Sequence, residues 1–254
     1  MDTVIARRWI ERWDRQQEDG LSEREERFTA IIDVVQVASG RNDPLVLDVG
    51  CGPGSLGARL LDRLPDAAVV GIDADPVTLA LGRAAYGEKI TFVDADLRAP
   101  DWPSLLPVDR PADAAVSTTA LHWLTEDGLR AFYRALAAVL RPGGVFLNGD
   151  HLREDPATAP ELARLGRALN DLEDRRRFPD GHAETWTGWW DAVAADPELS
   201  SLASMRATLS VGADHGPSGA SLLSAHVAAL RAAGFAEVGT LWQHGANRLL
   251  CAIR

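Results

Sequence analysis

Short apolar runs that alternate with amphipathic segments form the most restrictive pattern in the chain. The apolar runs are 44–50, 67–73, 89–96, 111–118 and 144–150. Helix-like patterns lie between several of them, at 55–64, 75–87 and 125–144. Continuous apolar runs are typical of strands buried on both faces of a parallel sheet. Their alternation with helices predicts a doubly wound α/β fold with right-handed crossovers.

The flanking regions predict an antiparallel strand and a helical cap. The runs 236–245 and 247–254 are joined by a short turn, so the last strand is expected to be antiparallel. Residues 151–219, rich in tryptophan, arginine and acidic side chains, are expected to form helices over the ligand-binding crevice. Residues 1–40 are expected to form N-terminal helices that act as a lid. We therefore expect one domain, 1–254, with a seven-stranded, mostly parallel sheet.

Local signals predict where individual helices begin and end. Ser22 and Glu25 have the spacing of a capping box at a helix N-terminus. Pro142 and the two glycines after it are expected to end the helix that precedes the fifth strand. Trp9 and Trp13 are four residues apart, which places both rings on one face of a short helix.

Composition and charge exclude several classes of protein. The 254 residues carry a formal net charge of −11, which argues against a broad nucleic-acid-binding face. No apolar run approaches the ~20 residues of a membrane-spanning helix, and the polar N-terminus lacks a signal-peptide pattern. Cys51 and Cys251 have neither disulfide-framework nor metal-ligand spacing. We expect a cytoplasmic monomer or homodimer with no metal, no nucleic-acid partner and no membrane partner.

A glycine loop, LDVGCGPGS, follows the first long apolar run. The phosphate-binding loop of nucleotide hydrolases ends in Gly-Lys-Ser or Gly-Lys-Thr, but here Gly54 is followed by Ser55 and Leu56. The dinucleotide pattern Gly-x-Gly-x-x-Gly is matched only in part. A pyrophosphate needs hydrogen-bond donors, whereas Asp48 places a carboxylate at this loop. Such an acid suits a ligand that carries an ammonium or sulfonium group.

Acidic residues also end the next two predicted strands. Asp73 ends the second strand, where a carboxylate can bind both hydroxyls of a ribose. Asp96 ends the third, where a carboxylate can accept a hydrogen from an adenine amino group. S-adenosylmethionine contains an amine, a sulfonium, a ribose and an adenine. The three acids therefore predict this cofactor, and a nicotinamide oxidoreductase is the less favoured alternative.

Five segments carry a resemblance to a known family. VLDVGCGPG, VVGIDADP, ITFVDADL, DAAVSTTALHWL and LRPGGVFL resemble the successive motifs of class I S-adenosylmethionine-dependent methyltransferases. The resemblance is close over 45–150 and loose over the last two strands. STTALHWL is most similar to the small-molecule branch that includes trans-aconitate methyltransferase. The Asn/Asp-Pro-Pro-aromatic motif of nucleobase and glutamine amino-methyltransferases is missing after the fourth predicted strand. The family implies a Rossmann-like fold and methyl transfer.

The resemblance also implies which residues hold the cofactor. The backbone of 50–54 would pass under the methionine part, Asp73 would bind the ribose, and Asp96 with Leu97 would frame the adenine. Thr118 or Thr119 would lie near the methionine amine. The predicted cofactor-binding residues are Asp48, Gly50, Cys51, Gly52, Gly54, Asp73, Ala74, Ala95, Asp96, Leu97, Thr118 and Thr119.

The acceptor side is less constrained by the sequence. Methyl transfer from a sulfonium depends mainly on alignment, and a base is needed only when the acceptor arrives protonated. His122 and His151, after the fourth and fifth strands, are the catalytic candidates, although a structural role explains His122 equally well. The predicted acceptor-site residues are Trp13, Gln17, Trp123, His182, Trp186 and Trp190. Packing of the helical cap explains the tryptophans at least as well.

Taken together, these features predict transfer of a methyl group to O, N or C of a small molecule, with 151–219 covering the acceptor site. The alternative is a protein that binds S-adenosylmethionine without methyl transfer, or that remodels it. The segment TLWQHGANRLLCAIR loosely resembles the C-terminal strands of carboxy-S-adenosylmethionine synthase, which is the reason for keeping that alternative.

Overall fold

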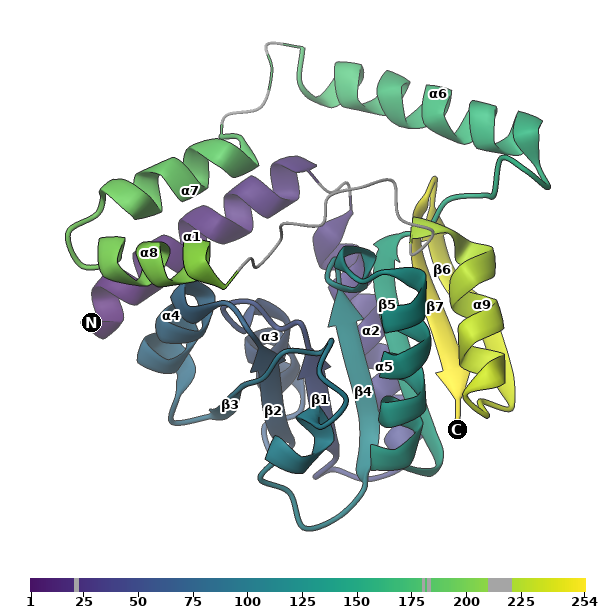
Figure 1. The fold of residues 1–254 in the computed structure, drawn as a ribbon, viewed down its shortest axis with the longest axis horizontal. Helices are drawn as coiled ribbons and strands as arrows, with labels where there is room; N and C mark the ends of the chain where they lie inside the picture. Colours follow the sequence, from purple (N-terminus) through teal and green to yellow (C-terminus); the bar gives the residue numbers. More distant parts are fainter. Residues whose placement is uncertain (21–22, 180, 182–183, 210–220) are drawn as a thin grey trace.

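A seven-stranded sheet forms the centre of the computed structural model, which describes residues 1–20, 23–179, 181, 184–209 and 221–254 (Figure 1). The strand order is β3-β2-β1-β4-β5-β7-β6, and β7 is antiparallel to both of its neighbours. The strands are β1 (Leu45–Val49), β2 (Ala68–Asp73), β3 (Ile90–Asp94), β4 (Ala112–Thr118), β5 (Leu140–His151), β6 (Glu237–His244) and β7 (Asn247–Ile253). The predicted doubly wound, mostly parallel α/β sheet is confirmed.

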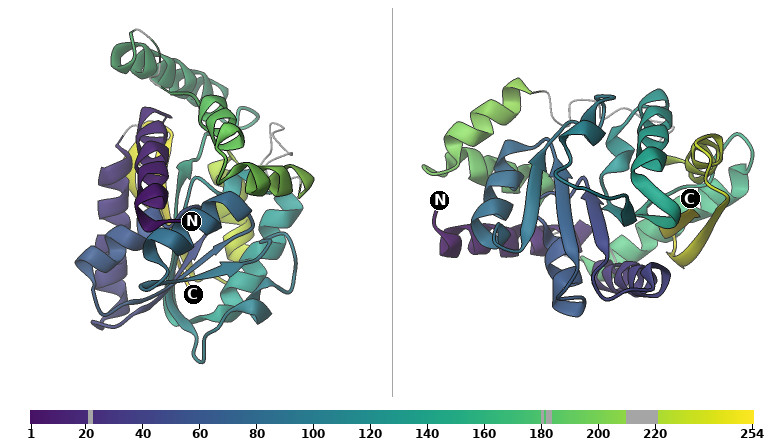
Figure 2. Two further views of the ribbon diagram at one scale, coloured as in Figure 1. Left: turned by 90° about the vertical axis from the view of Figure 1, so that its left-hand side faces the viewer. Right: turned by 90° about the horizontal axis from the view of Figure 1, so that it is seen from below.

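Helices cover both faces of this sheet. α2 and α3 bury apolar side chains against one face, and α5 and α9 against the other (Figure 2). The α-helices of the described residues are α1 (Thr3–Gly20), α2 (Arg24–Ser39), α3 (Ser55–Arg63), α4 (Pro76–Tyr86), α5 (Glu126–Val139), α6 (Pro160–Arg177), α7 (Trp186–Ala195), α8 (Ser200–Thr208) and α9 (Leu223–Ala232). Two short 3₁₀ helices are η1 (Trp102–Leu105) and η2 (Leu121–Trp123). Because both sheet faces are covered, β1 is buried along its whole length.

A third apolar cluster lies apart from the two faces of the sheet. α1, α7 and α8 pack together with α4 near the carboxyl end of β2 (Figure 1). The cluster includes Ala6 and Ile10 of α1, Val77 of α4, and Trp189 and Val193 of α7, all of them buried. Segments from the N-terminus and from the insertion therefore share one small core, which brings their tryptophans to the carboxyl edge of the parallel strands.

Three local expectations differ from the structure. α1 is 18 residues long, not short, and Glu23 rather than Ser22 occupies the N-cap position of α2, with a left-handed φ of 59°. Ser22 lies outside the described residues. α5 ends at Val139 and β5 begins at Leu140, four residues earlier than the predicted strand. The residue before a proline avoids the helical region, so Pro142 ends the helix well before its own position.

None of the helices among the described residues combines the length and the apolar character that crossing a membrane requires.

Candidate active site

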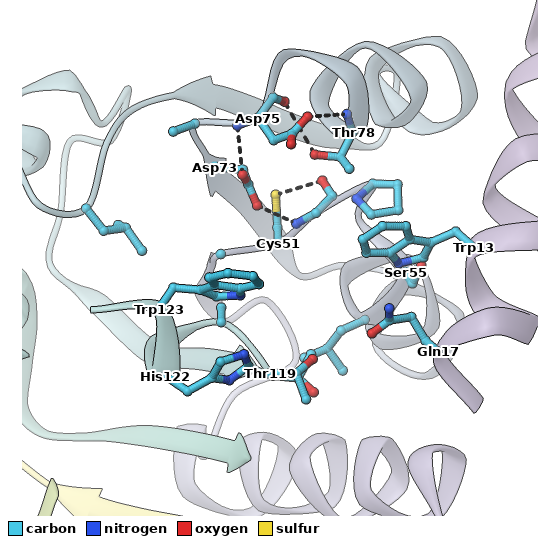
Figure 3. Close-up of a pocket in the computed structure, with 18 of the residues that line it drawn as sticks. Trp13, Gln17, Cys51, Ser55, Asp73, Asp75, Thr78, Thr119, His122 and Trp123 are labelled. Carbon is cyan, nitrogen blue, oxygen red and sulfur yellow. Dashed lines mark hydrogen bonds between the residues drawn. The ribbon is translucent and has the colours of Figure 1, made fainter. Parts of the chain in front are cut away.

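A cavity of about 430 Å³ lies at the carboxyl ends of β1, β2, β3 and β4 (Figure 3). This is the edge at which open α/β sheets bind ligands. It is lined by seventeen of the residues predicted for the cofactor, the acceptor or the chemistry: Trp13, Gln17, Gly50, Cys51, Gly52, Asp73, Ala74, Ala95, Asp96, Leu97, Thr118, Thr119, His122, Trp123, His151, Trp186 and Trp190. Strand order and helix packing together have brought these residues, up to 177 positions apart, to one cavity.

The glycine loop is shaped by close contacts as well as by positive φ. Gly50, Gly52 and Gly54 have φ values of 69°, 53° and 86°. A Cβ on Gly50 would stand 2.3 Å from the Cβ of Ala120, which real atoms cannot do. The backbone N–H of Gly50 donates to the Ile72 carbonyl at 2.8 Å, which ties the loop to the end of β2. The glycines therefore let the first loop pass close under the loop after β4.

Asp73 holds the loops after β1 and β2 together. Its carboxylate accepts hydrogen bonds from the backbone N–H groups of Gly52 at 2.7 Å and Asp75 at 2.9 Å (Figure 3). Burial raises the pKa of Asp73 to about 6, although these backbone donors favour its ionised form. Asp75 caps α4 by accepting from the N–H groups of Val77 and Thr78. The carboxylate of Asp73 thus stands in the cavity, fixed by the backbone.

Asp48 and Gly54 do not line the cavity, so for these two residues the expected direct cofactor contact is not what the structure shows. Asp48 is 1% exposed and lies below the glycine loop, next to Gly57 of α3. Burial raises the pKa of Asp48 to about 7, and the Gly57 backbone offsets this only in part. Its side chain points into the protein because alternate residues of a strand face opposite sides. Gly54 is the N-cap of α3 and packs against Phe92.

The adenine end of the predicted site is more open. Asp96 lines the cavity but is 41% exposed and forms an ion pair with Arg98 at 2.8 Å. Partial burial would raise the pKa of Asp96, but the hydrogen bonds from Arg98 outweigh it and lower the pKa. Ala95 is buried beside it. The carboxylate therefore stays ionised and able to accept a hydrogen bond.

His122 forms a dyad with an acid that the sequence analysis missed. Its Nδ1 lies 3.0 Å from both carboxylate oxygens of Asp150, which is 1% exposed. Burial would raise the pKa of Asp150, but His122 outweighs it and lowers the pKa to about 2. In turn, burial would lower the pKa of His122, and Asp150 outweighs it and raises that pKa. The only sequence signal for Asp150 was its position at the end of the fifth strand.

Arg27 of α2 is a second buried charge at this edge. Its guanidinium donates to Thr118 Oγ1 and to Asn247 Oδ1, each at 2.7 Å. Gly149 makes room for it, because a Cβ there would stand 2.7 Å from the Arg27 side chain. Burial lowers the pKa of Arg27 to about 10, despite the opposing effect of Asp150. The available sequence signal was an arginine within the apolar stripe of a predicted helix.

Thr119 and His151 complete the region around the dyad. Thr119 has a φ of 50°, unusual for a residue with a branched Cβ, and its N–H donates to the Gly149 carbonyl at 2.9 Å. His151 lines the cavity, and burial lowers its pKa. Both His122 and His151 also line a second, more polar cavity of about 430 Å³ that borders α6. The two histidines therefore stand between the two cavities.

Tryptophans form the wall opposite the strand ends. The ring of Trp13 lies 5.2 Å from that of Trp186 and 4.9 Å from that of Trp189. Trp123 is 6.4 Å from Trp186, and Trp190 stacks under the guanidinium of Arg206 at 3.7 Å. Trp189 is fully buried behind this wall and does not line the cavity. Helices α1 and α7 thus supply an aromatic cover, while His182 lies outside the described residues.

The residues at this edge fit an adenosyl cofactor with a charged amino-acid tail. The loop has no room for a side chain at Gly50, Asp73 presents a half-buried carboxylate where a ribose would lie, and Asp96 offers an acceptor at the next strand end. The glycine loop, Asp73 and Asp96 lie at the carboxyl ends of β1, β2 and β3, in that order. Such a fold and edge define a Rossmann-like enzyme that binds a nucleoside cofactor.

Comparisons with known proteins agree with this class. A family model described as a methyltransferase domain matches residues 46–144. The trans-aconitate 2-methyltransferase of Azoarcus sp. (strain BH72) is 35% identical over 202 residues, which cover 72% of this chain and 75% of that protein. The protein of the same name from Escherichia coli (strain K12 / DH10B) is 32% identical over 120 residues, 47% of this chain and 44% of that protein. The chain thus matches less than half of the Escherichia coli relative.

Two solved structures share the fold. An O-methyltransferase family protein from Burkholderia thailandensis has a TM-score of 0.57 at 20% identity, over 95% of this chain and 68% of that one. PigF with SAH has a TM-score of 0.55 at 19% identity, over 88% of this chain and 55% of that one. The chain belongs to the class I S-adenosylmethionine-dependent methyltransferases. Its cofactor is accordingly S-adenosylmethionine, and the expected methyltransferase activity is confirmed at the level of this class.

Proposed function

We propose that this enzyme methylates an oxygen or nitrogen of a small-molecule acceptor that arrives protonated, and that His122 is the general base. The observation that carries the proposal is the contact between His122 Nδ1 and the buried carboxylate of Asp150. A carboxylate at Nδ1 favours the tautomer with a proton there and the lone pair on Nε2. Since His122 lines the cavity, this arrangement suits removal of a proton from an acceptor.

The charges around the cavity also bear on the acceptor. Among the described residues three arginines line it, and each forms an ion pair: Arg24 with Asp14 at 3.0 Å, Arg98 with Asp96 at 2.8 Å and Arg206 with Asp75 at 2.5 Å. A carboxylate acceptor, such as the trans-aconitate in the names of the relatives, is already ionised at neutral pH and therefore needs no base. A hydroxyl or a protonated nitrogen does need one, which favours these groups as acceptors.

The predicted cofactor residues have separate tasks in this proposal. The loop at Gly50 and Gly52 would pass beneath the methionine part, Asp73 would bind the ribose, and Asp96 would face the adenine. The sulfonium of the bound cofactor supplies the electrophilic methyl group. His122 would take the proton of the acceptor, and Asp150 would stabilise the resulting imidazolium. The aromatic cover would exclude water and hold the acceptor in line, the effect on which such a displacement chiefly depends.

The proposal is tested with His122→Asn, Asp150→Asn and the wild-type enzyme. Turnover is measured as S-adenosylhomocysteine release with a panel of small phenols, amines and trans-aconitate. We expect turnover of hydroxyl or amine acceptors, and a loss of about 10²–10⁴-fold in kcat for His122→Asn with unchanged affinity for S-adenosylhomocysteine. An unchanged kcat would remove His122 from the chemistry.

The role of Asp150 has its own readout in the pH dependence. Because Asp150 raises the pKa of His122, the wild-type rate should rise with pH through a value above the usual 6.5 of histidine. In Asp150→Asn this rise should move to lower pH while kcat falls. NMR titration of the His122 imidazole measures the same shift without any acceptor, and an identical pKa in both proteins would contradict the dyad.

A further inference from the structure

Helix α6 presents an apolar stripe that no part of the described chain covers. Leu162, Leu165, Leu169 and Leu172 are 61%, 47%, 57% and 45% exposed. The helix lies along one side of the molecule, away from the sheet (Figure 1), and Ala163 is its buried residue. Four large apolar side chains in a row on one helix are unusual for a surface that faces only water.

The spacing of these leucines is that of a coiled coil. The intervals are three, four and three residues, so the leucines occupy successive a and d positions of a heptad. The set is also symmetric about residue 167, because Leu162 and Leu172 lie five residues from it on either side and Leu165 and Leu169 lie two residues from it on either side. In an antiparallel pair of α6 helices, Leu162 would meet Leu172 of the second copy. Leu165 would likewise meet Leu169 of the second copy.

The charges beside the stripe agree with the antiparallel direction. Glu161 and Arg175 occupy the g positions of this heptad, and g positions face each other in antiparallel pairs. Glu161 of one copy would then meet Arg175 of the other, twice by symmetry. In a parallel pair Glu161 would instead face the e position, which is Gly166. Ala168 and Gly166 flank the centre of the symmetric stripe, and their small size permits close approach of the two helices.

We propose that the leucine stripe of α6 binds the same stripe of a second copy of this chain, in a two-fold antiparallel pair. The rest of α6 is already attached to its own protomer, since Glu173 contacts His244 at the end of β6, with 3.1 Å between Oε1 and Nε2. The leucines do not take part in that attachment. A symmetric patch that is complementary to itself gives a closed dimer, the commonest assembly of soluble proteins.

The pairing would have a consequence for the catalytic edge. Asn170, Glu173 and Arg177 of α6 line the polar cavity that His122 and His151 also border. Joining α6 to a second α6 would hold that wall in place. The interface is small compared with the ~1,600 Å² of a typical stable complex, so the dimer should dissociate on dilution. This inference does not depend on the acceptor proposed above.

Sedimentation velocity of the complete chain over a wide concentration range tests the proposal. We expect the wild type to shift from monomer to dimer as concentration rises, and Leu165→Glu/Leu169→Glu to remain monomeric throughout. Val37→Glu is the matched control, because Val37 is 83% exposed on α2 and remote from the stripe; it should dimerise like the wild type. Circular dichroism establishes that each variant is folded.

Charge reversal tests the direction of pairing. Arg175→Glu should weaken dimerisation at least tenfold, and the further change Glu161→Arg should restore it, because the pair is then reversed. A wild type that stays monomeric at about 100 µM, the dissociation range of a weak complex, would overturn the proposal. So would a leucine variant that still dimerises, since its interface would lie elsewhere. Equal weakening in the single and double charge variants would overturn the antiparallel direction.

Discussion

Three aspartates at the carboxyl edge of the sheet differ in pKa because their neighbours differ. Asp48 is opposed by its burial and by the nearby charge of Asp73, the Gly57 backbone N–H offsets this only in part, and its pKa rises to about 7. Asp73 accepts from two backbone donors, and its pKa rises only to about 6. Asp150 faces His122, and its pKa falls to about 2. Burial opposes ionisation in all three, and the partner decides the outcome.

Asp48→Asn should change how stability depends on pH. The folded-state pKa of Asp48 is raised from 3.8 to about 7. At a pH between these two values the native state therefore holds a proton that the unfolded chain has lost. Stability therefore falls as pH rises through this window. Asparagine carries no charge, so the variant should gain roughly 2–3 kcal/mol relative to wild type between pH 5 and pH 8. Urea unfolding at both pH values measures this, and a constant difference would contradict it.

At the scale of the element, the glycine loop depends on contact with another loop as well as on its own backbone. Gly50→Ala should weaken binding of S-adenosylhomocysteine at least tenfold, because its Cβ would overlap Ala120 and displace the loop that carries Thr119. Gly40 has a similar φ of 64° but no atom within 4 Å of an added Cβ. Gly40→Ala therefore controls for backbone strain, which costs about 1–3 kcal/mol. Calorimetric titration should show near wild-type affinity for this control.

Helix ends show what local sequence decides within an element. Asp75 and Pro76 begin α4 as their types require, and the ends of β1 and β2 follow the apolar runs. The boundary between α5 and β5 was misplaced, because Leu140 pairs with Ala112 of β4. An apolar residue that fits both a helix and a strand takes the state that its sheet partner stabilises.

At the scale of the whole molecule, the aromatic cover joins the N-terminal helix to the insertion. Trp13→Ala should weaken affinity for S-adenosylhomocysteine more than Trp9→Ala. Trp9 packs on Trp189 with ring centroids 5.7 Å apart but does not line the cavity, whereas Trp13 does both. Each change should cost roughly 1–4 kcal/mol of stability. The difference in affinity between the two variants therefore reports on the cavity wall and not on packing. Equal affinities in the two variants would show that the cover has only a packing role.

The sequence by itself determined the alternation of strands and helices, the glycine loop and the acids at the strand ends, since these depend on hydrophobic period and on neighbours a few residues away. Only the tertiary structure paired His122 with Asp150, placed Arg27 against Thr118 and Asn247, and turned Asp48 away from the cavity. These contacts join residues from different strands and helices. They depend on strand order and on which face a side chain takes, and no local pattern specifies either.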